Sequence, residues 1–177
     1  MTNSQNPLVS IVIPLYNEEQ VFDRLINRLD SVLNSFQYPT EVVLIDDGSR
    51  DKTAELMKAK CLADARYTGL FLSRNHGHQL ALSAGLAHAR GTEAIMVLDG
   101  DLQDPPELIP ELYQKAISGY EVVYAKRKKR QGEGILKNGK IGSCARNNRK
   151  WLLFILAKSV TYRHAYAAIM RRGLREF

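Results

Sequence analysis

Two carboxylates one residue apart, Asp99 and Asp101, directly follow the apolar run of residues 94–98. A short apolar run bounded by glycine and proline is typical of a buried strand. The two acids are therefore predicted to lie at the C-terminal end of that strand, where open α/β sheets bind ligands. Neighbouring carboxylates repel each other unless a cation lies between them, and Mg²⁺ or Mn²⁺ readily bridges carboxylates to phosphates. The pair indicates a metal–diphosphate site, and a solvated turn is the alternative interpretation.

Three further polar clusters each follow a predicted strand. They are residues 14–19 (PLYNEE), residues 46–51 (DDGSRD) and residues 75–78 (NHGH). Because the carboxyl ends of parallel strands share one edge of a sheet, we expect all four clusters to converge on one crevice. Such convergence is much harder to explain by solvated loops than any single cluster would be.

Each cluster also has a simpler interpretation. Tyr16 is either a loop aromatic or a ring that stacks on a nucleobase. Asp46 and Asp47 either cap the following helix or accept hydrogen bonds from a base or ribose. His76 and His78 have the spacing of a zinc pair, but no cysteine or further histidine lies nearby. We therefore expect Arg74 and His78 to face phosphate instead.

The elements that position these clusters alternate regularly along the chain. Apolar periodicity and turn residues predict strands at residues 8–14, 42–45, 69–72, 94–98 and 121–125, and helices at residues 19–36, 52–63, 79–90 and 106–118. Asp51 is the expected N-cap of the second helix. Strand–helix alternation of this kind predicts an α/β fold with a mostly parallel sheet.

The composition matches a soluble globular protein. The 177 residues are 45% hydrophobic and 25% charged, enough for one domain with a sizeable core. No run approaches the roughly 20 apolar residues that span a bilayer, and the polar N-terminus shows no secretory signal. Cys61 and Cys144 have no framework spacing and are interpreted as incidental thiols in a reducing compartment.

The formal charge is strongly asymmetric. The net charge of +6 divides into −7 over residues 1–125 and +13 over residues 126–177. We therefore divide the chain into a donor-binding domain, residues 1–125, and a basic tail, residues 126–177. The tail, with its apolar run at residues 151–157, is interpreted as an interfacial helix or a poorly folded end. Its charge favours an anionic partner, either lipid or nucleic acid, and no aromatic–basic motif supports nucleic acid.

The four clusters together resemble family 2 glycosyltransferases. The resemblance rests on residues 12–19 (VIPLYNEE), 45–53 (IDDGSRDKT), 74–85 (RNHGHQLALSAG) and 98–107 (LDGDLQDPPE). It is strongest to the branch that acts on polyprenyl phosphates, which includes dolichyl-phosphate mannose synthases and undecaprenyl-phosphate glucosyltransferases. It runs from about residue 8 to about residue 137 and implies the GT-A nucleotide-sugar-binding fold, a mostly parallel sheet flanked by helices.

The resemblance also implies roles for individual residues. Asp99 and Asp101 are the catalytic pair, and Asp101 with Gln103 holds Mg²⁺ or Mn²⁺ against the diphosphate. The residues implied to bind the nucleotide sugar are Pro14, Tyr16, Glu18, Asp46, Asp47 and Asp99. The acceptor phosphate is expected at Arg127, Lys128 and Arg130. His76 stands where the family more often has an aromatic residue.

The function implied is the inverting, metal-dependent transfer of a sugar from a nucleotide diphosphate sugar, such as UDP-glucose, to a polyprenyl phosphate. The implied location is peripheral, on the anionic cytoplasmic face of the plasma membrane, with no transmembrane helix and no nucleic-acid partner. Residues 138–177 do not continue the family pattern, and their composition indicates a truncated or frameshifted reading frame after about residue 137. The alternative is therefore a catalytically impaired remnant that binds nucleotide sugars.

Overall fold

The computed structural model describes residues 8–120, 122–125 and 153–157, and this part of the chain alternates strands with helices. The elements are β1 (Val9–Leu15), α1 (Glu19–Ser35), β2 (Thr40–Asp46), α2 (Thr53–Ala63), β3 (Tyr67–Phe71), α3 (His78–His88), β4 (Ala94–Leu98), the 3₁₀ helix η1 (Pro106–Leu108), α4 (Ile109–Ile117), β5 (Val122–Tyr124) and β6 (Leu153–Ala157). The predicted alternation is confirmed, with shifts of one to three residues at most boundaries.

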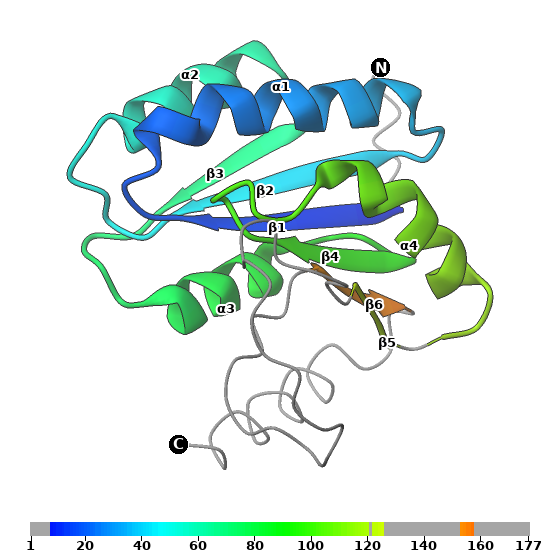
Figure 1. Ribbon diagram of the computed structural model, residues 1–177. Helices are drawn as coiled ribbons and strands as arrows, with labels where there is room; N and C mark the ends of the chain where they lie inside the picture. Colours follow the sequence, from blue (N-terminus) through cyan, green and yellow to red (C-terminus); the bar gives the residue numbers. More distant parts are fainter. Residues whose placement is uncertain (1–7, 121, 126–152, 158–177) are drawn as a thin grey trace, which may run out of the picture.

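These strands form one six-stranded sheet in the order β3-β2-β1-β4-β6-β5 (Figure 1). The first four are parallel: β1 pairs with β2 and with β4, and β2 pairs with β3. At the other edge β6 runs antiparallel to both β4 and β5. The predicted α/β class and mostly parallel sheet are therefore confirmed.

Helices cover both faces of the sheet. Figure 1 shows α1, α2 and α4 on one face and α3 on the other. This explains why all seven residues of β1 are buried. A parallel strand with helices on both sides carries a nearly continuous apolar sequence, because successive side chains point into two different cores.

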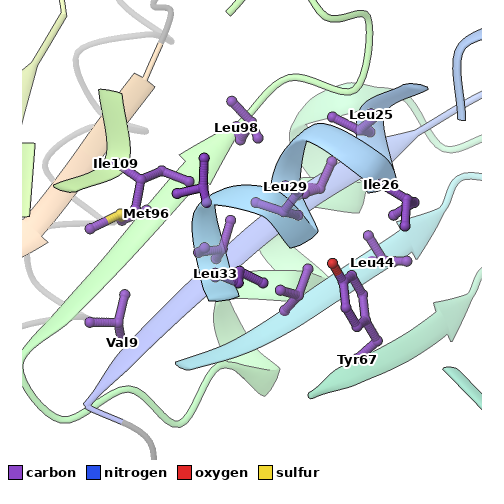
Figure 2. Close-up of a cluster of buried hydrophobic side chains, with 14 of the residues drawn as sticks. Val9, Leu25, Ile26, Leu29, Leu33, Leu44, Tyr67, Met96, Leu98 and Ile109 are labelled. Atoms are coloured by element: carbon purple, nitrogen blue, oxygen red, sulfur yellow. The ribbon is translucent and has the colours of Figure 1, made fainter. Parts of the chain in front are cut away.

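The larger core lies beneath α1, whose buried side chains recur at helical spacing. They are Phe22, Leu25, Ile26, Leu29, Val32 and Leu33. Figure 2 shows Leu25, Ile26, Leu29 and Leu33 lying over the sheet, in the same buried cluster as Leu44 of β2 and Met96 of β4. Each such side chain stabilises the fold by about 1.5–3 kcal/mol when it is fully buried.

The smaller core lies beneath α3. It is formed by Val12, Val43, Ile45, Ala81 and Ile95. A Cβ atom at Gly85 would overlap the side chains of Val12 and Ile45, so glycine allows α3 to approach the sheet closely. This close approach fixes the position of the N-terminus of α3, which lies near the predicted crevice.

Two local predictions need correction. The helix predicted at residues 106–118 begins with the 3₁₀ turn η1 and becomes α-helical at Ile109. The N-cap of α2 is Lys52 and not Asp51. Asp51 lies one position earlier, and its Oδ1 accepts a hydrogen bond of 3.0 Å from the backbone N–H of Thr53.

The interpretation of residues 151–157 as an interfacial helix or poorly folded end is wrong for Leu153–Ala157, which forms β6. A short apolar run satisfies its backbone by pairing, and β6 lies between β4 and β5. This pairing partner is distant in sequence, so local periodicity did not reveal it. The rest of the tail lies outside the described residues, and the division at residue 125 stays a prediction. Among the described helices, none has the length and hydropathy needed to cross a bilayer.

Candidate functional site

The four polar clusters do converge. Each follows the C-terminal end of one of the parallel strands β1, β2, β3 and β4, so all four lie along one edge of the sheet. The chain continues from β1 to β2 on one side, and β4 pairs on the other side of β1. The strand order therefore reverses between β1 and β4. Open α/β sheets bind ligands at such a switch point, because the loops on its two sides diverge and leave a crevice.

The loop after β1 and the loop after β2 are joined by reciprocal hydrogen bonds. The backbone N–H of Asn17 donates to Ser49 Oγ at 2.9 Å, and the backbone N–H of Arg50 donates to Asn17 Oδ1 at 2.8 Å. The backbone N–H of Glu18 donates to Oγ1 of the fully buried Thr53 at 2.8 Å. These contacts hold the predicted nucleoside residues of the two loops in one fixed arrangement.

Asp46 and Asp47 are both buried at the end of β2, with 4% and 3% of their surface exposed. Oδ1 of Asp46 accepts a hydrogen bond of 3.1 Å from the backbone N–H of Ser49. The two carboxylate oxygens of Asp47 accept from the backbone N–H groups of His76 at 2.7 Å and Gly77 at 2.9 Å. Asp47 thus ties the loop after β2 to the loop that opens α3, and its hydrogen bonds offset the cost of burying a polar side chain.

Gly48 is required at this junction for two reasons. Its φ of +68° is in the left-handed region that favours glycine. A Cβ atom there would also overlap the backbone of Arg74. The glycine of the DDGS sequence therefore allows the loops after β2 and β3 to pack backbone against backbone.

Gly100 has the corresponding role on the other side of the crevice. A Cβ atom at this position would overlap Leu15 Cδ2 and would lie 3.2 Å from the carbonyl oxygen of Pro14. The absence of a side chain brings the Asp99–Asp101 pair against the end of β1. Oδ1 of Asp99 lies 3.8 Å from Nε2 of His78, so α3 also reaches this part of the site.

The two predicted metal ligands lie on one tight turn. Oδ1 of Asp101 accepts a hydrogen bond of 3.0 Å from the backbone N–H of Gln103. Between them Leu102 has a φ of +59°, which is uncommon for a residue with a side chain. A residue held in this region costs of order 1–3 kcal/mol and persists only where the surroundings enforce it, as they often do at functional sites.

Negative charge accumulates where the loops after β1 and β4 face each other. The pKa of Glu18 is raised, first by burial and then by the negative charges of Asp101 and Asp51. This shift shows that Glu18 and Asp101 share one electrostatic environment. A divalent cation at Asp101 would relieve this repulsion, because it would favour the ionised form of each acid.

The residues present fit a Mg²⁺ or Mn²⁺ ion that is shared with a ligand. The described residues contain no group of three histidine, cysteine or acidic side chains arranged to hold a metal. Mg²⁺ is commonly held by one or two carboxylates together with substrate phosphates and water. The carboxylate of Asp101 and the amide carbonyl of Gln103 would supply oxygen ligands to such an ion.

The structure places the remaining predicted residues as follows. Pro14 is buried within β1, and Tyr16 follows the strand with 39% of its surface exposed. Arg127, Lys128 and Arg130 lie outside the described residues. Sequence reasoning gave no role to Asn17, Ser49 and Thr53, which join the loops. The asparagine itself could have indicated a turn at position 17, because asparagine is one of the few residues that adopt the left-handed conformation readily.

Solved structures of known proteins share this architecture. The chain superimposes on a fragment of S. aureus TarS in complex with UDP with a TM-score of 0.55 and 24% identity, over 73% of this chain and 38% of that one. It superimposes on glucosyl-3-phosphoglycerate synthase from Mycobacterium tuberculosis with a TM-score of 0.53 and 22% identity, over 67% and 43% of the two chains. The fold is the GT-A fold of glycosyltransferases.

Sequence comparison then identifies the family. The sequence model of Glycosyl transferase family 2 matches residues 10–176, and the chain belongs to this family. It is 47% identical over 128 residues to the uncharacterized glycosyltransferase YkcC of Bacillus subtilis, which covers 72% of this chain and 39% of the relative. It is 42% identical over 132 residues to undecaprenyl-phosphate 4-deoxy-4-formamido-L-arabinose transferase of Aeromonas hydrophila, over 74% and 40% of the two chains. The chain thus matches about two fifths of the length of these relatives.

Proposed function

We propose that this chain binds a nucleotide diphosphate sugar and carries the donor half of a transferase that delivers the sugar to a polyprenyl phosphate. The observation that carries the proposal is the packing of Gly100 against Leu15. This contact brings the Asp99–Asp101 pair to the end of β1 at the switch point of the sheet, where the negative charge of Asp101 acts on Glu18. Membership of the family and the names of the undecaprenyl-phosphate relatives support the same function.

The nucleoside is proposed to lie between the loops after β1 and β2. The exposed ring of Tyr16 can stack on the base, since aromatic rings stack on any base face. The Asp46 carboxylate can accept hydrogen bonds from the N–H groups of a base or the hydroxyls of a ribose. UDP is the proposed nucleotide, and glucose or a related hexose is the proposed sugar.

The diphosphate is proposed to lie beside the loop after β4. Asp101 and Gln103 would hold Mg²⁺ or Mn²⁺, which when bound stabilises the negative charge of the departing nucleoside diphosphate. Asp99 borders the same space from the other side of Gly100, and its Oδ1 lies 3.8 Å from Nε2 of His78. The role of the protein here is to fix the position of the leaving group before the sugar–phosphate bond breaks.

The acceptor is proposed to be a polyprenyl phosphate at an anionic membrane surface. Its phosphate oxygen is already ionised at neutral pH, so attack on the anomeric carbon needs little base catalysis, and a single displacement inverts that carbon. Arg127, Lys128 and Arg130 are the proposed partners of the acceptor phosphate, and the membrane's cytoplasmic face is the proposed location. Lys and Arg side chains near an anionic surface each contribute about 1 kcal/mol to such association.

A combined binding and turnover experiment tests this proposal. The chain of residues 1–177 is titrated with UDP in the presence and absence of Mn²⁺, and then incubated with UDP-glucose and undecaprenyl phosphate. Metal-dependent UDP binding is expected. Residues 138–177 contain a single acidic residue, Glu176, and so lack the acidic acceptor-side motif that the resemblance leads us to expect. We therefore expect little turnover by this chain and salt-sensitive binding to anionic vesicles.

The two readouts separate the donor and acceptor parts of the proposal. Robust formation of a glucosyl lipid, with the inverted anomeric configuration, would establish a complete transferase. Metal-dependent UDP binding without turnover would support the impaired nucleotide-sugar-binding form. Absence of UDP binding at millimolar concentration, with or without metal, would reject both.

A further inference from the structure

We propose that Asn17 is a positioning residue that sets the nucleoside pocket, although its own side chain is directed at the protein. The inference rests on the proposed function, because it concerns the same nucleotide site. Asn17 lies between Tyr16, whose ring is proposed to stack on the base, and Glu18, to which the family resemblance gives a nucleotide-sugar contact. Its φ of +56° turns the chain between them.

The left-handed conformation of Asn17 places Tyr16 and Glu18 on a sharp local turn. Asparagine tolerates this region better than most residues that carry a side chain. An alanine at the same position would favour another backbone conformation, and the residues on either side of the turn would then be redirected. The free protein would populate the binding-competent loop less often, which weakens apparent affinity in proportion to the lost population.

The side chain and backbone of Asn17 also fix the second loop. Oδ1 of Asn17 accepts from the backbone N–H of Arg50 at 2.8 Å, and its own N–H donates to Ser49 Oγ at 2.9 Å. The backbone N–H of Ser49 in turn donates to Oδ1 of Asp46 at 3.1 Å. A continuous chain of hydrogen bonds therefore links Asn17 to the Asp46 carboxylate, the proposed ligand on the other side of the nucleoside.

Three substitutions separate the conformational effect of Asn17 from its hydrogen bond. Asn17→Asp keeps both the tolerance for positive φ and an acceptor for Arg50, so uridine affinity is expected to stay within about twofold of wild type. Asn17→Gly keeps only the backbone tolerance and is expected to bind uridine about threefold more weakly. Asn17→Ala loses both and is expected to bind about tenfold more weakly. Uridine is the probe because it is uncharged, so the added charge of the aspartate has little effect on it.

Ser49→Ala tests the same link from the second loop. It removes the acceptor of the Asn17 N–H, and a loss of uridine affinity similar to that of Asn17→Gly is expected. Asn34→Ala is the matched control. Asn34 lies near the opposite end of α1, and its Oδ1 also accepts a hydrogen bond, from Nη1 of Arg66 at 3.1 Å. This control should leave uridine affinity unchanged.

The decisive comparison is between uridine and pyrophosphate with Mn²⁺, each titrated against the full chain by nuclear magnetic resonance. A positioning role at the nucleoside end predicts weaker uridine binding by Asn17→Ala with unchanged pyrophosphate binding. Equal losses of both probes, or wild-type uridine affinity in Asn17→Ala, would overturn the inference. If the wild-type chain binds no UDP, the proposed function fails and the inference with it. If the wild type binds UDP and the variants match it, the inference alone fails.

Discussion

Gly100 packs against the side chain of Leu15 with no room for a Cβ atom between them. Leu15 is the last residue of β1 and is almost fully buried, so its side chain has little freedom to move aside. The contact joins the loop that carries Asp99 and Asp101 to the strand that precedes Tyr16 and Glu18. The two sides of the proposed donor site are therefore positioned relative to each other by a single glycine.

The first prediction follows from this contact. Gly100→Ala should push the loop away from β1 and weaken Mn²⁺-dependent UDP binding by about tenfold, because a shift of about 1 Å is enough to misplace a ligand group. Leu15→Val removes the obstructing Cδ2 atom, so the double variant should recover part of the lost affinity. Titration calorimetry measures both effects. A double variant no better than Gly100→Ala alone would show that the Leu15 contact does not set the loop.

The second prediction concerns the metal. Asp101→Ala should remove the enhancement of UDP binding by Mn²⁺, because the cation loses an anionic ligand. UDP is titrated with and without Mn²⁺ into each variant. The control is Glu111→Ala, which removes an exposed carboxylate that pairs with Lys115 on α4. A metal enhancement that survives in Asp101→Ala would place the cation elsewhere.

The third prediction concerns the nucleoside. Asp46→Ala should weaken uridine and UDP by about 1–3 kcal/mol, the cost of a lost charged hydrogen bond. Pyrophosphate binding should be unaffected, since Asp46, the last residue of β2, is proposed to contact the nucleoside, whereas Asp101 is proposed to hold the metal at the diphosphate. Asp46→Asn keeps the shape of the side chain, so its affinity for uridine shows how much of the loss in Asp46→Ala is due to the missing charge. A variant that loses pyrophosphate and keeps uridine would assign Asp46 to the other end of the donor.

The fourth prediction concerns acid stability. Hydrogen bonds from the Arg66 guanidinium hold the pKa of the Asp64 carboxyl well below its usual range. A carboxyl with a lowered folded-state pKa stabilises the protein above its unfolded-state pKa of about 3.9, and this stabilisation is lost as the pH falls below that value. Asp64→Asn should therefore cost about 1–2 kcal/mol at pH 7, allowing for the partial exposure of Arg66.

Urea unfolding at pH 7 and at pH 2.5 measures this difference. The gap between wild type and Asp64→Asn should narrow at the lower pH, because the Asp64 carboxyl of the unfolded wild-type chain then binds a proton that the folded protein, with its lowered pKa, does not bind. Glu111→Gln, whose partner Lys115 is half exposed, is the control and should differ little from wild type at either pH. A gap of the same size at both pH values would show that the Arg66 contact does not depend on ionisation of Asp64.

The amino-acid sequence alone was enough to predict the class of fold and the edge of the sheet at which the site lies. Apolar runs and helical spacing are local properties, and the stripe of Leu25 and Leu29 on α1 was readable because one face of a helix must be buried. Parallel strands then required the acidic clusters after β2 and β4 to share an edge. The sequence therefore predicted that Asp46 and Asp99 lie at the same edge of the sheet, and the strand order confirms this.

Only the tertiary structure decided how the loops fit together and where the chain re-enters the sheet. Asn17 reaches Ser49 across 32 positions of sequence, and β6 pairs with β4, which lies more than 50 positions earlier. Contacts of this kind depend on the distance between backbones after folding, and a sequence pattern records local preference only. The same limit applies to Gly48 and Gly100: the sequence shows a glycine, and the packing around it shows why no larger residue fits.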